Sequence, residues 1–268
     1  MELSTMPQTR ATKNAYWCRR PRRRGLPRSA GFIRNGAVVV TPPRLRHRKL
    51  LTSSEAAHPG ASGKMMVMRV RPVGRSALLV ECRDGDEVSA WRAELWRRRE
   101  AGDLRFVDIV PGATTILLDG VEPAAAALLT ELPTPPAVSP TDGPLVEIRT
   151  TFDGDDLADV AARWGVSSLL AVERLTTTPL TVAFCGFAPG FAYMRGLPEE
   201  WAVPRLAAPR PRVPAGSIGL AGSYVGIYPA ASPGGWRLVG HTDQKLFDGR
   251  RKAPALLPPG TRVRLVPR

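Results

Sequence analysis

The sequence predicts an α+β protein in which a small two-layer α/β domain precedes a β-barrel domain. Two observations predict this. Residues 65–132 follow the order β-β-α-β-β-α, which suits one sheet covered by helices. Residues 186–240 contain 10 glycines and 8 prolines in 55 positions, a density that helices do not tolerate. Short β-branched and apolar runs recur among them, which is typical of a barrel with long, rigid loops.

The small domain is expected to contain four strands and two helices. Asp84 or Asp86 can cap a helix running to about Arg99. Pro123 suits the first turn of a second helix, through Leu132. The expected strands are β-branched and apolar runs at 68–73, 77–82, 106–110 and 114–118. Residues 133–144 are proline-rich and are predicted to be a linker.

The barrel domain is expected over residues 145–268, with two helices inserted near its start. Asp155 is predicted to start the first helix and Gly165 to end it. Ser167 can cap the second helix, which runs to about Arg174. The expected strands are 145–150, 181–184, 218–220, 224–228, 236–239 and 262–266.

The positive charge is concentrated near the N-terminus. Of the net charge of +14, residues 1–64 contribute 14 basic and 2 acidic residues, and residues 65–268 contribute 24 and 22. The nearly neutral body predicts no nucleic-acid binding by the folded part. Residues 1–64 lack hydrophobic periodicity and are predicted to be a disordered, dispensable extension. A start codon assigned too early is favoured, and a nucleic-acid or membrane arm and a targeting peptide are the alternatives.

The cysteines and hydropathy indicate a reduced, cytoplasmic protein. Three scattered cysteines make no disulfide framework, and no Cys/His spacing suits a metal, so no metal site is expected. No run of about 18 apolar residues occurs, so no membrane association is expected.

Two side chains are candidate nucleophiles. The run 215–219 approximates a GxSxG elbow around Ser217, but another β run follows where the elbow needs a helix, so a tight-turn serine is favoured. Cys185 could pair with His241, the one histidine of residues 65–268, although a buried cysteine is usually inert. His241 remains a candidate because imidazole titrates near neutrality.

The strongest local signal is in two loops, 186–191 and 232–236, that interleave glycine, proline and aromatic residues. Glycine permits close approach to a ligand, proline fixes the loop and the aromatic ring supplies a contact wall. The alternative interpretation is that both loops are corners of the barrel. The residues alone do not separate these two interpretations.

Four blocks of sequence, taken in order, resemble one protein family. They are Thr181–Tyr193 (TVAFCGFAPGFAY), Pro209–Ser217 (PRPRVPAGS), the series GIYP, SPGGW and GHT within 226–242, and Leu256–Val263 (LLPPGTRV). The series resembles the B subunit of 5-oxoprolinase, a family also labelled allophanate hydrolase subunit 1 or sporulation kinase inhibitor. The resemblance covers about Met68 to Arg268. Where the family commonly has Gly-Arg-Thr, this chain has Gly240-His241-Thr242.

The resemblance implies a small ferredoxin-like α/β domain and a cyclophilin-like β-barrel. It also implies a carboxyltransferase-type domain (subdomain C and D) that works with the C subunit of 5-oxoprolinase, which has a related barrel, and with the A subunit. Together these subunits use ATP to hydrolyse 5-oxo-L-proline to L-glutamate. Because the chain has no GxxxxGK[ST] phosphate loop, we expect it to supply part of a composite site and to be inactive alone.

His241 and Arg212 are the predicted catalytic residues. Arg212 could pair with a carboxylate or a phosphate, and a surface salt bridge is its equally weighted alternative. The predicted substrate-binding residues come from the same loops and are Phe187, Pro189, Gly190, Phe191, Pro214, Gly216, Ser217, Tyr228, Pro233, Gly234, Gly235 and Trp236.

Two other functions stay open on the sequence. One is a regulatory binding protein that inhibits a histidine kinase. The other is a carboxyltransferase or allophanate hydrolase-type subunit in urea breakdown. The three functions differ in their expected gene neighbours, namely oxoprolinase subunits, a sensor kinase or a biotin carboxylase.

Overall fold

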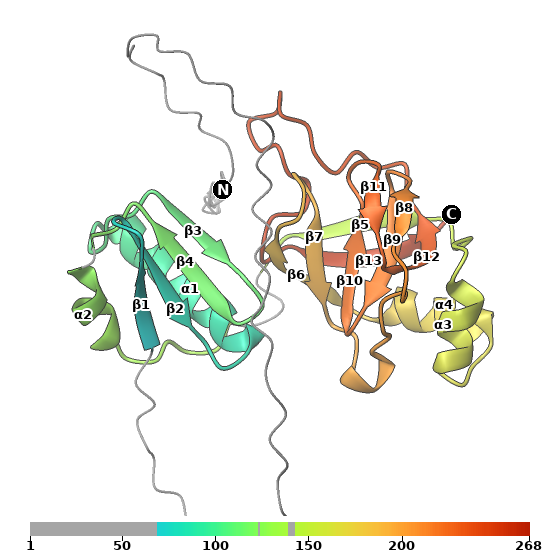
Figure 1. Ribbon diagram of the computed structural model, residues 1–268, viewed down its shortest axis with the longest axis horizontal. Helices are drawn as coiled ribbons and strands as arrows, with labels where there is room; N and C mark the ends of the chain where they lie inside the picture. The colour runs from blue at the N-terminus through green and yellow to red at the C-terminus, as the bar shows by residue number, and fades with distance from the viewer. Residues whose placement is uncertain (1–68, 123, 139–142) are drawn as a thin grey trace, which may run out of the picture. The chain divides into compact units, whose positions relative to one another are not determined.

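The computed structural model describes residues 69–122, 124–138 and 143–268 (Figure 1). The predicted basic extension, Pro123 and part of the predicted linker lie outside the described residues. The α+β class and the barrel are confirmed. The domain boundaries at 65–132 and 145–268 stay predictions.

Four antiparallel strands form the sheet of the small domain, in the order β1-β2-β4-β3. Their bounds are Arg69–Val73 (β1), Ala77–Glu81 (β2), Asp108–Pro111 (β3) and Thr115–Asp119 (β4). Helix α1 (Gly85–Ala101) buries Trp91 and Leu95, and the side chain of Asp84 accepts from the N–H groups at its first turn, as a capping residue should. Helix α2 (Ala125–Thr130) is shorter than predicted.

Seven strands form the barrel wall in the order β12-β9-β10-β7-β6-β13-β5. Only β13 and β5 pair in parallel. At the two edges of the sheet, Thr151, which follows β5, and His241, the last residue of β12, exchange two backbone hydrogen bonds of 2.9 and 2.8 Å and so close the sheet on itself. The bounds are Leu145–Thr150 (β5), Leu180–Cys185 (β6), Ala192–Arg195 (β7), Ser217–Ala221 (β9), Tyr224–Ile227 (β10), Arg237–His241 (β12) and Arg262–Pro267 (β13).

Two short helices, α3 (Leu157–Arg163) and α4 (Ser168–Thr177), follow β5, and a 3-10 turn, η1, spans Glu199–Trp201. The Ser167 side chain accepts from the Leu170 N–H, so the predicted cap of α4 is confirmed. The predicted start of α3 at Asp155 is wrong: the helix begins at Leu157, and the side chain of Asp156 makes no capping bond. None of the described helices is long and apolar enough to span a bilayer.

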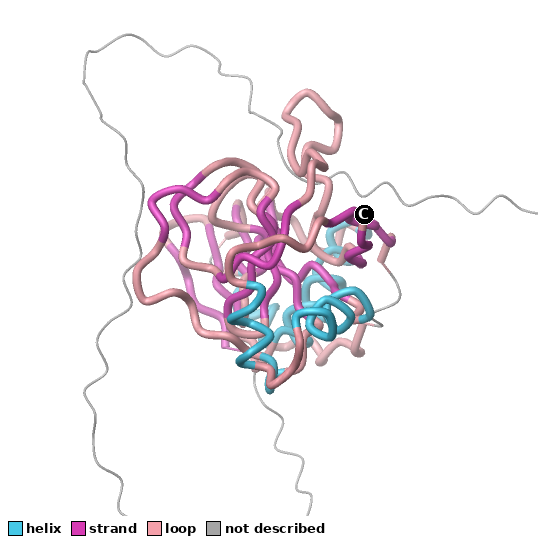
Figure 2. The backbone as a smooth tube through the Cα atoms, turned by 90° about the vertical axis from the view of Figure 1, so that its right-hand side faces the viewer, coloured by secondary structure: helices cyan, strands magenta, loops and turns pink. Residues whose placement is uncertain are grey.

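The sequence patterns missed β7 and a two-stranded sheet made by β8 (Arg210–Val213) and β11 (Ser232–Gly234). Both strands of the small sheet contain a proline, and proline is tolerated only where a strand lacks a neighbour on its N–H side. A sheet of two strands offers such a side. Figure 2 shows that long loops connect many of the strands.

Candidate functional site

The loop after β6, Gly186–Phe191, is held by its own backbone. The Gly186 N–H donates to the Phe191 carbonyl at 3.2 Å, and the Phe191 N–H donates to the Ala188 carbonyl at 2.9 Å. The Ala188 N–H donates to the Gly186 carbonyl at 2.7 Å, which closes a γ-turn centred on Phe187. Phe187 has φ 65° and is the one non-glycine residue with positive φ in the described part of the chain. This conformation costs on the order of 1–3 kcal/mol and persists only where the surroundings fix it.

Three buried rings join the two predicted loops. The ring of Phe191 meets Tyr228 edge-on at 5.2 Å and Trp236 at 5.5 Å, a favourable geometry for aromatic pairs. All three side chains are buried. We call Phe191, Tyr228 and Trp236 the aromatic cluster. The two loops therefore meet in a buried cluster that is separate from the main core of the barrel.

The glycines near the aromatic cluster are needed because these rings lie against the backbone. A Cβ on Gly226 would lie 2.7 Å from the Trp236 ring and 2.8 Å from the Phe191 ring. A Cβ on Gly234 would overlap the Tyr228 hydroxyl oxygen. The sequence predicted that the glycines of the two loops let a ligand approach the backbone closely. In the structure, the protein's own aromatic side chains occupy that position.

The predicted substrate-binding residues divide into three groups by exposure. Phe187 is 63% exposed, and Pro189, Pro214 and Pro233 are also exposed. Gly190 and Gly234 are half-buried. The buried group is Phe191, Gly216, Ser217, Tyr228, Gly235 and Trp236. Only the first group can meet a ligand or partner without rearrangement, and substrate binding by any of them stays a prediction.

The turn before β9 is tied to two neighbouring strands. Gly216 has φ 83°, donates its N–H to the Tyr228 carbonyl at 2.7 Å and accepts from the Thr242 N–H at 3.0 Å. Ser217 is buried and is the first residue of β9, so no helix follows it. The strand–turn–helix of a nucleophile elbow is absent here, and the interpretation as a tight-turn serine is confirmed.

His241 pairs with an acid that the sequence analysis did not single out. Its Nδ1 lies 2.8 Å from Oδ1 of Asp153. Cys185 instead donates its thiol to the Leu257 carbonyl at 3.4 Å. Burial raises the pKa of the Cys185 thiol to about 11. The hypothesis of a Cys185–His241 pair is therefore wrong, because each group has another partner and the thiol stays protonated near neutrality.

Arg212 is exposed on β8 and makes no ion pair with the described residues. The surface salt bridge considered as its alternative role is thus not formed within the described chain. Its guanidinium presents its donors to solvent, where a carboxylate or phosphate could be bound in a bidentate way. Its catalytic role stays a prediction.

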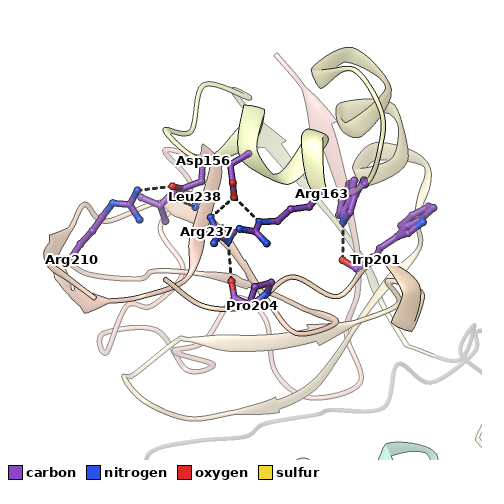
Figure 3. A network of polar contacts seen from close by, with 9 residues as sticks. Asp156, Arg163, Trp201, Pro204, Arg210, Arg237 and Leu238 are labelled. Carbon is purple, nitrogen blue, oxygen red and sulfur yellow. Dashed lines mark hydrogen bonds and ion pairs between the residues drawn. The ribbon is translucent and has the colours of Figure 1, made fainter. Parts of the chain in front are cut away.

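A polar network beside α3 was not predicted (Figure 3). Asp156 accepts from Arg210 at 2.9 Å and from the backbone N–H of Leu238 at 2.7 Å, and it is 8% exposed. Arg237 donates to the Pro204 carbonyl at 2.9 Å and pairs with Asp159. The network fixes β8 and β12 to the start of α3. A run rich in aspartate at 153–159 was visible, but the partners of Asp156 lie more than 50 residues away in sequence.

A pocket of about 360 Å³ opens beside the γ-turn. Two segments distant in sequence form its walls, namely the loop after β6 and the residues around the Phe247–Ala255 bridge. Phe187, Pro189 and Gly190 of the predicted site line it. A Cβ on Gly190 would lie 2.7 Å from Cβ of Phe247, so the glycine lets the two walls meet.

Comparison with known proteins decides the family. The model of the carboxyltransferase domain, subdomain C and D, matches residues 68–257. The B subunit of 5-oxoprolinase from Escherichia coli O157:H7 is 38% identical over 206 residues, which are 73% of this chain and 94% of that protein. The chain belongs to the family of 5-oxoprolinase B subunits. A second member, from Haemophilus influenzae, is 42% identical over 132 residues, covering 48% of this chain and 62% of that protein.

Solved structures agree with the family fold. The crystal structure of TTHA0988 matches 72% of this chain with a TM-score of 0.59 and 29% identity, and this chain spans 40% of that longer chain. The urea carboxylase of Kluyveromyces lactis matches 75% of this chain with a TM-score of 0.55, and the match covers 22% of that enzyme. At 17% identity this second likeness concerns the fold alone.

Within this family fold, the described residues contain no group of three or more His, Cys, Asp or Glu side chains placed to hold a metal ion. An anionic substrate would be bound by cationic side chains. Among the predicted site residues, Arg212 has a guanidinium that forms no ion pair with the described residues. Asp153 and the network around Asp156 are the polar features that sequence reasoning missed.

Proposed function

We propose that this chain is the B subunit of an ATP-dependent 5-oxoprolinase, which hydrolyses 5-oxo-L-proline to L-glutamate. The observation that supports this most is the match to the Escherichia coli relative along 94% of that relative's length. A match of this extent concerns the whole relative and is not limited to one domain. The likeness to urea carboxylase is one of fold and supports no urea reaction.

The chemistry explains a requirement for ATP. The substrate is a lactam, and an amide carbonyl resists attack by water. Phosphorylation of the lactam oxygen would make the ring carbon electrophilic. Attack by water and departure of the ring nitrogen would then open the C–N bond to an acyl phosphate, which a second water hydrolyses to glutamate and phosphate. Phosphoryl transfer depends mainly on positioning and on neutralising negative charge. Arg212 is proposed to bind the substrate carboxylate or a phosphate, since its guanidinium is exposed and unpaired within the described chain.

We further propose that the site is composite and that the chain is inactive alone. Phosphoryl transfer needs several positive groups around one phosphate. The predicted residues supply Arg212 and, when protonated, His241, whose Nδ1 is engaged by Asp153. The A and C subunits of 5-oxoprolinase are proposed to supply the remainder of the site in the cytoplasm.

The test is reconstitution with the two other subunits. The co-expressed A, B and C subunits should release phosphate and glutamate in amounts that depend on 5-oxoproline, and omission of any one of them should abolish the reaction. Arg212→Ala should lower kcat/KM by about tenfold to a thousandfold. Arg149→Ala, which also removes an exposed arginine of the barrel, is the matched control. A purified three-subunit complex without oxoproline-dependent ATP hydrolysis would contradict the proposal.

A further inference from the structure

The imidazole of His241 is held by a carboxylate from a neighbouring segment. Its Nδ1 lies 2.8 Å from Oδ1 of Asp153. An ionised carboxylate can only accept hydrogen bonds, so the hydrogen in this bond belongs to Nδ1. The bond made by one ring nitrogen determines which nitrogen carries the proton of a neutral imidazole. Nε2 is therefore the unprotonated nitrogen, and its lone pair is available to accept a proton.

The backbones that carry these two side chains are fixed to one another. Thr151 and His241 exchange two backbone hydrogen bonds of 2.9 and 2.8 Å. A Cβ on Gly154 would overlap the Leu238 carbonyl oxygen, so the segment that follows Thr151 lies directly against β12. Asp153, between these two points of contact, is thus presented to the imidazole by two paired backbones.

The second ring nitrogen of His241 is free to reach a ligand. Nε2 makes no hydrogen bond to the residues that the structure describes, and the side chain is 40% exposed. The Thr242 N–H donates to the Gly216 carbonyl at 3.0 Å, so His241 and Ser217 form a non-hydrogen-bonded pair between β12 and β9. The side chains of such a pair leave the sheet on the same face. The imidazole therefore lies beside the turn at 214–217, which contains predicted substrate-binding residues.

Other charged groups close to this imidazole in the chain have different partners. Asp243 pairs with Arg268 at 2.6 Å. Arg237, at the start of β12, pairs with Asp159. The neighbouring strand β9 contains no charged residue. Among the described carboxylates, Asp153 is the one that bonds to the imidazole.

We propose that Asp153 is a positioning residue that keeps the proton of His241 on Nδ1, so that Nε2 serves as the general base for the water that opens the lactam ring. As the water oxygen bonds to the ring carbon of the phosphorylated lactam, Nε2 takes a proton from the water and passes it to the ring nitrogen. Nε2 transfers the second proton of that water in the same way when the C–N bond breaks and the acyl phosphate forms, so the imidazole ends neutral. Asp153 stabilises the transient imidazolium. This inference rests on the proposed function, which supplies the reaction.

The tautomer of His241 can be measured on the purified chain without partner subunits. Long-range 1H–15N spectra distinguish protonated from unprotonated ring nitrogens, and His241→Gln identifies the signals of His241 among those of the three histidines of the chain. We expect Nε2 of the neutral wild-type ring to be unprotonated. Asp153→Asn should shift the population toward the Nε2–H form, because a carboxamide can bond to either form of the ring. Asp243→Asn is the matched control, since Asp243 is 69% exposed, lies two residues from His241 and pairs with Arg268.

Kinetics of the reconstituted complex test the role of this tautomer. Asp153→Asn should lower kcat about a hundredfold and change KM by less than about threefold, because the substrate still binds while the base has the wrong tautomer. Adding Asp153→Asn to His241→Gln should have no further effect, whereas a purely structural role of Asp153 would lower activity in either background. Asp243→Asn should retain the wild-type kcat.

The two measurements separate this inference from the proposed function. A protonated Nε2 in the neutral wild-type ring overturns the inference, and so does a wild-type kcat of Asp153→Asn in an active complex; both results leave the proposed function standing. Independent losses in the double variant also overturn it, because Asp153 would then act without His241. A wild-type complex that does not hydrolyse 5-oxoproline contradicts the proposed function, and the spectra then decide on their own whether Asp153 positions His241.

Discussion

The loops 186–191 and 232–236 have similar compositions but different environments in the barrel. Trp236, at the end of the second loop, is 4% exposed and packs against Phe191 and two glycine-lined strands. Phe187, in the first loop, is 63% exposed on a strained turn. The comparison shows that a glycine, proline and aromatic pattern marks a rigid loop without stating whether its ring packs inward or faces outward. Predictions for Trp236, Gly234 and Phe187 test this difference, and a prediction for Asp153 and Asp156 applies the same contrast of burial to two acids.

The largest effect is expected for Trp236→Leu. Removing most of a buried ring leaves a cavity among Phe191 and Tyr228, which should lower the free energy of unfolding by about 2–4 kcal/mol. Denaturant unfolding measures the change. The specific activity of the reconstituted complex, per folded molecule, shows in the same preparation whether the ring also has a functional role. An unchanged denaturant midpoint would contradict the conclusion that the Trp236 ring packs in a buried cluster.

The next effect concerns two acids, Asp153 and Asp156, that bond to residues of β12. Asp156→Ala leaves Arg210 and the Leu238 N–H without their partner and should lower the free energy of unfolding by about 2–3 kcal/mol. Asp153→Ala removes a partner from His241, whose side chain is 40% exposed, and should cost less than about 1 kcal/mol. Urea titration measures the free energy of unfolding of both variants. Equal decreases would mean that burial of the carboxylate does not determine how much it stabilises the fold.

Gly234→Ala tests the packing between the second loop and the aromatic cluster. The added Cβ would overlap the Tyr228 hydroxyl oxygen, and such overpacking typically lowers the free energy of unfolding by about 1–3 kcal/mol. Tyr228→Phe removes that oxygen, so the double variant should recover part of the loss. Additive losses in this double-mutant cycle would show that the hydroxyl is not the obstacle.

The smallest effect is expected for Phe187→Gly. Relief of the positive φ opposes the loss of edge contacts with Phe191 and Tyr228, so the free energy of unfolding should change by less than about 1 kcal/mol. Denaturant unfolding again provides the measurement. A loss comparable to that of Trp236→Leu would show that Phe187 belongs to the core.

Local patterns were sufficient for much of the fold. The Ser167 cap, the Asp84 cap of α1 and most barrel strands follow from hydrogen-bonding capacity and apolar periodicity within a few residues. The family also followed from the sequence. These features depend on residues close together in the chain or on a recognisable series of motifs.

Only the tertiary structure determined the remaining features. Asp156 could have capped α3, but its two oxygens bond to Arg210 and Leu238, and a carboxylate engaged there is not free to cap the helix. The β8–β11 pair was missed because two proline-containing segments become strands only when each provides the other's hydrogen bonds. The pocket likewise needs residues near 187 and 250 to meet. The sequence by itself determined the local elements and the family, whereas long-range packing decided which side chains are buried, paired or exposed.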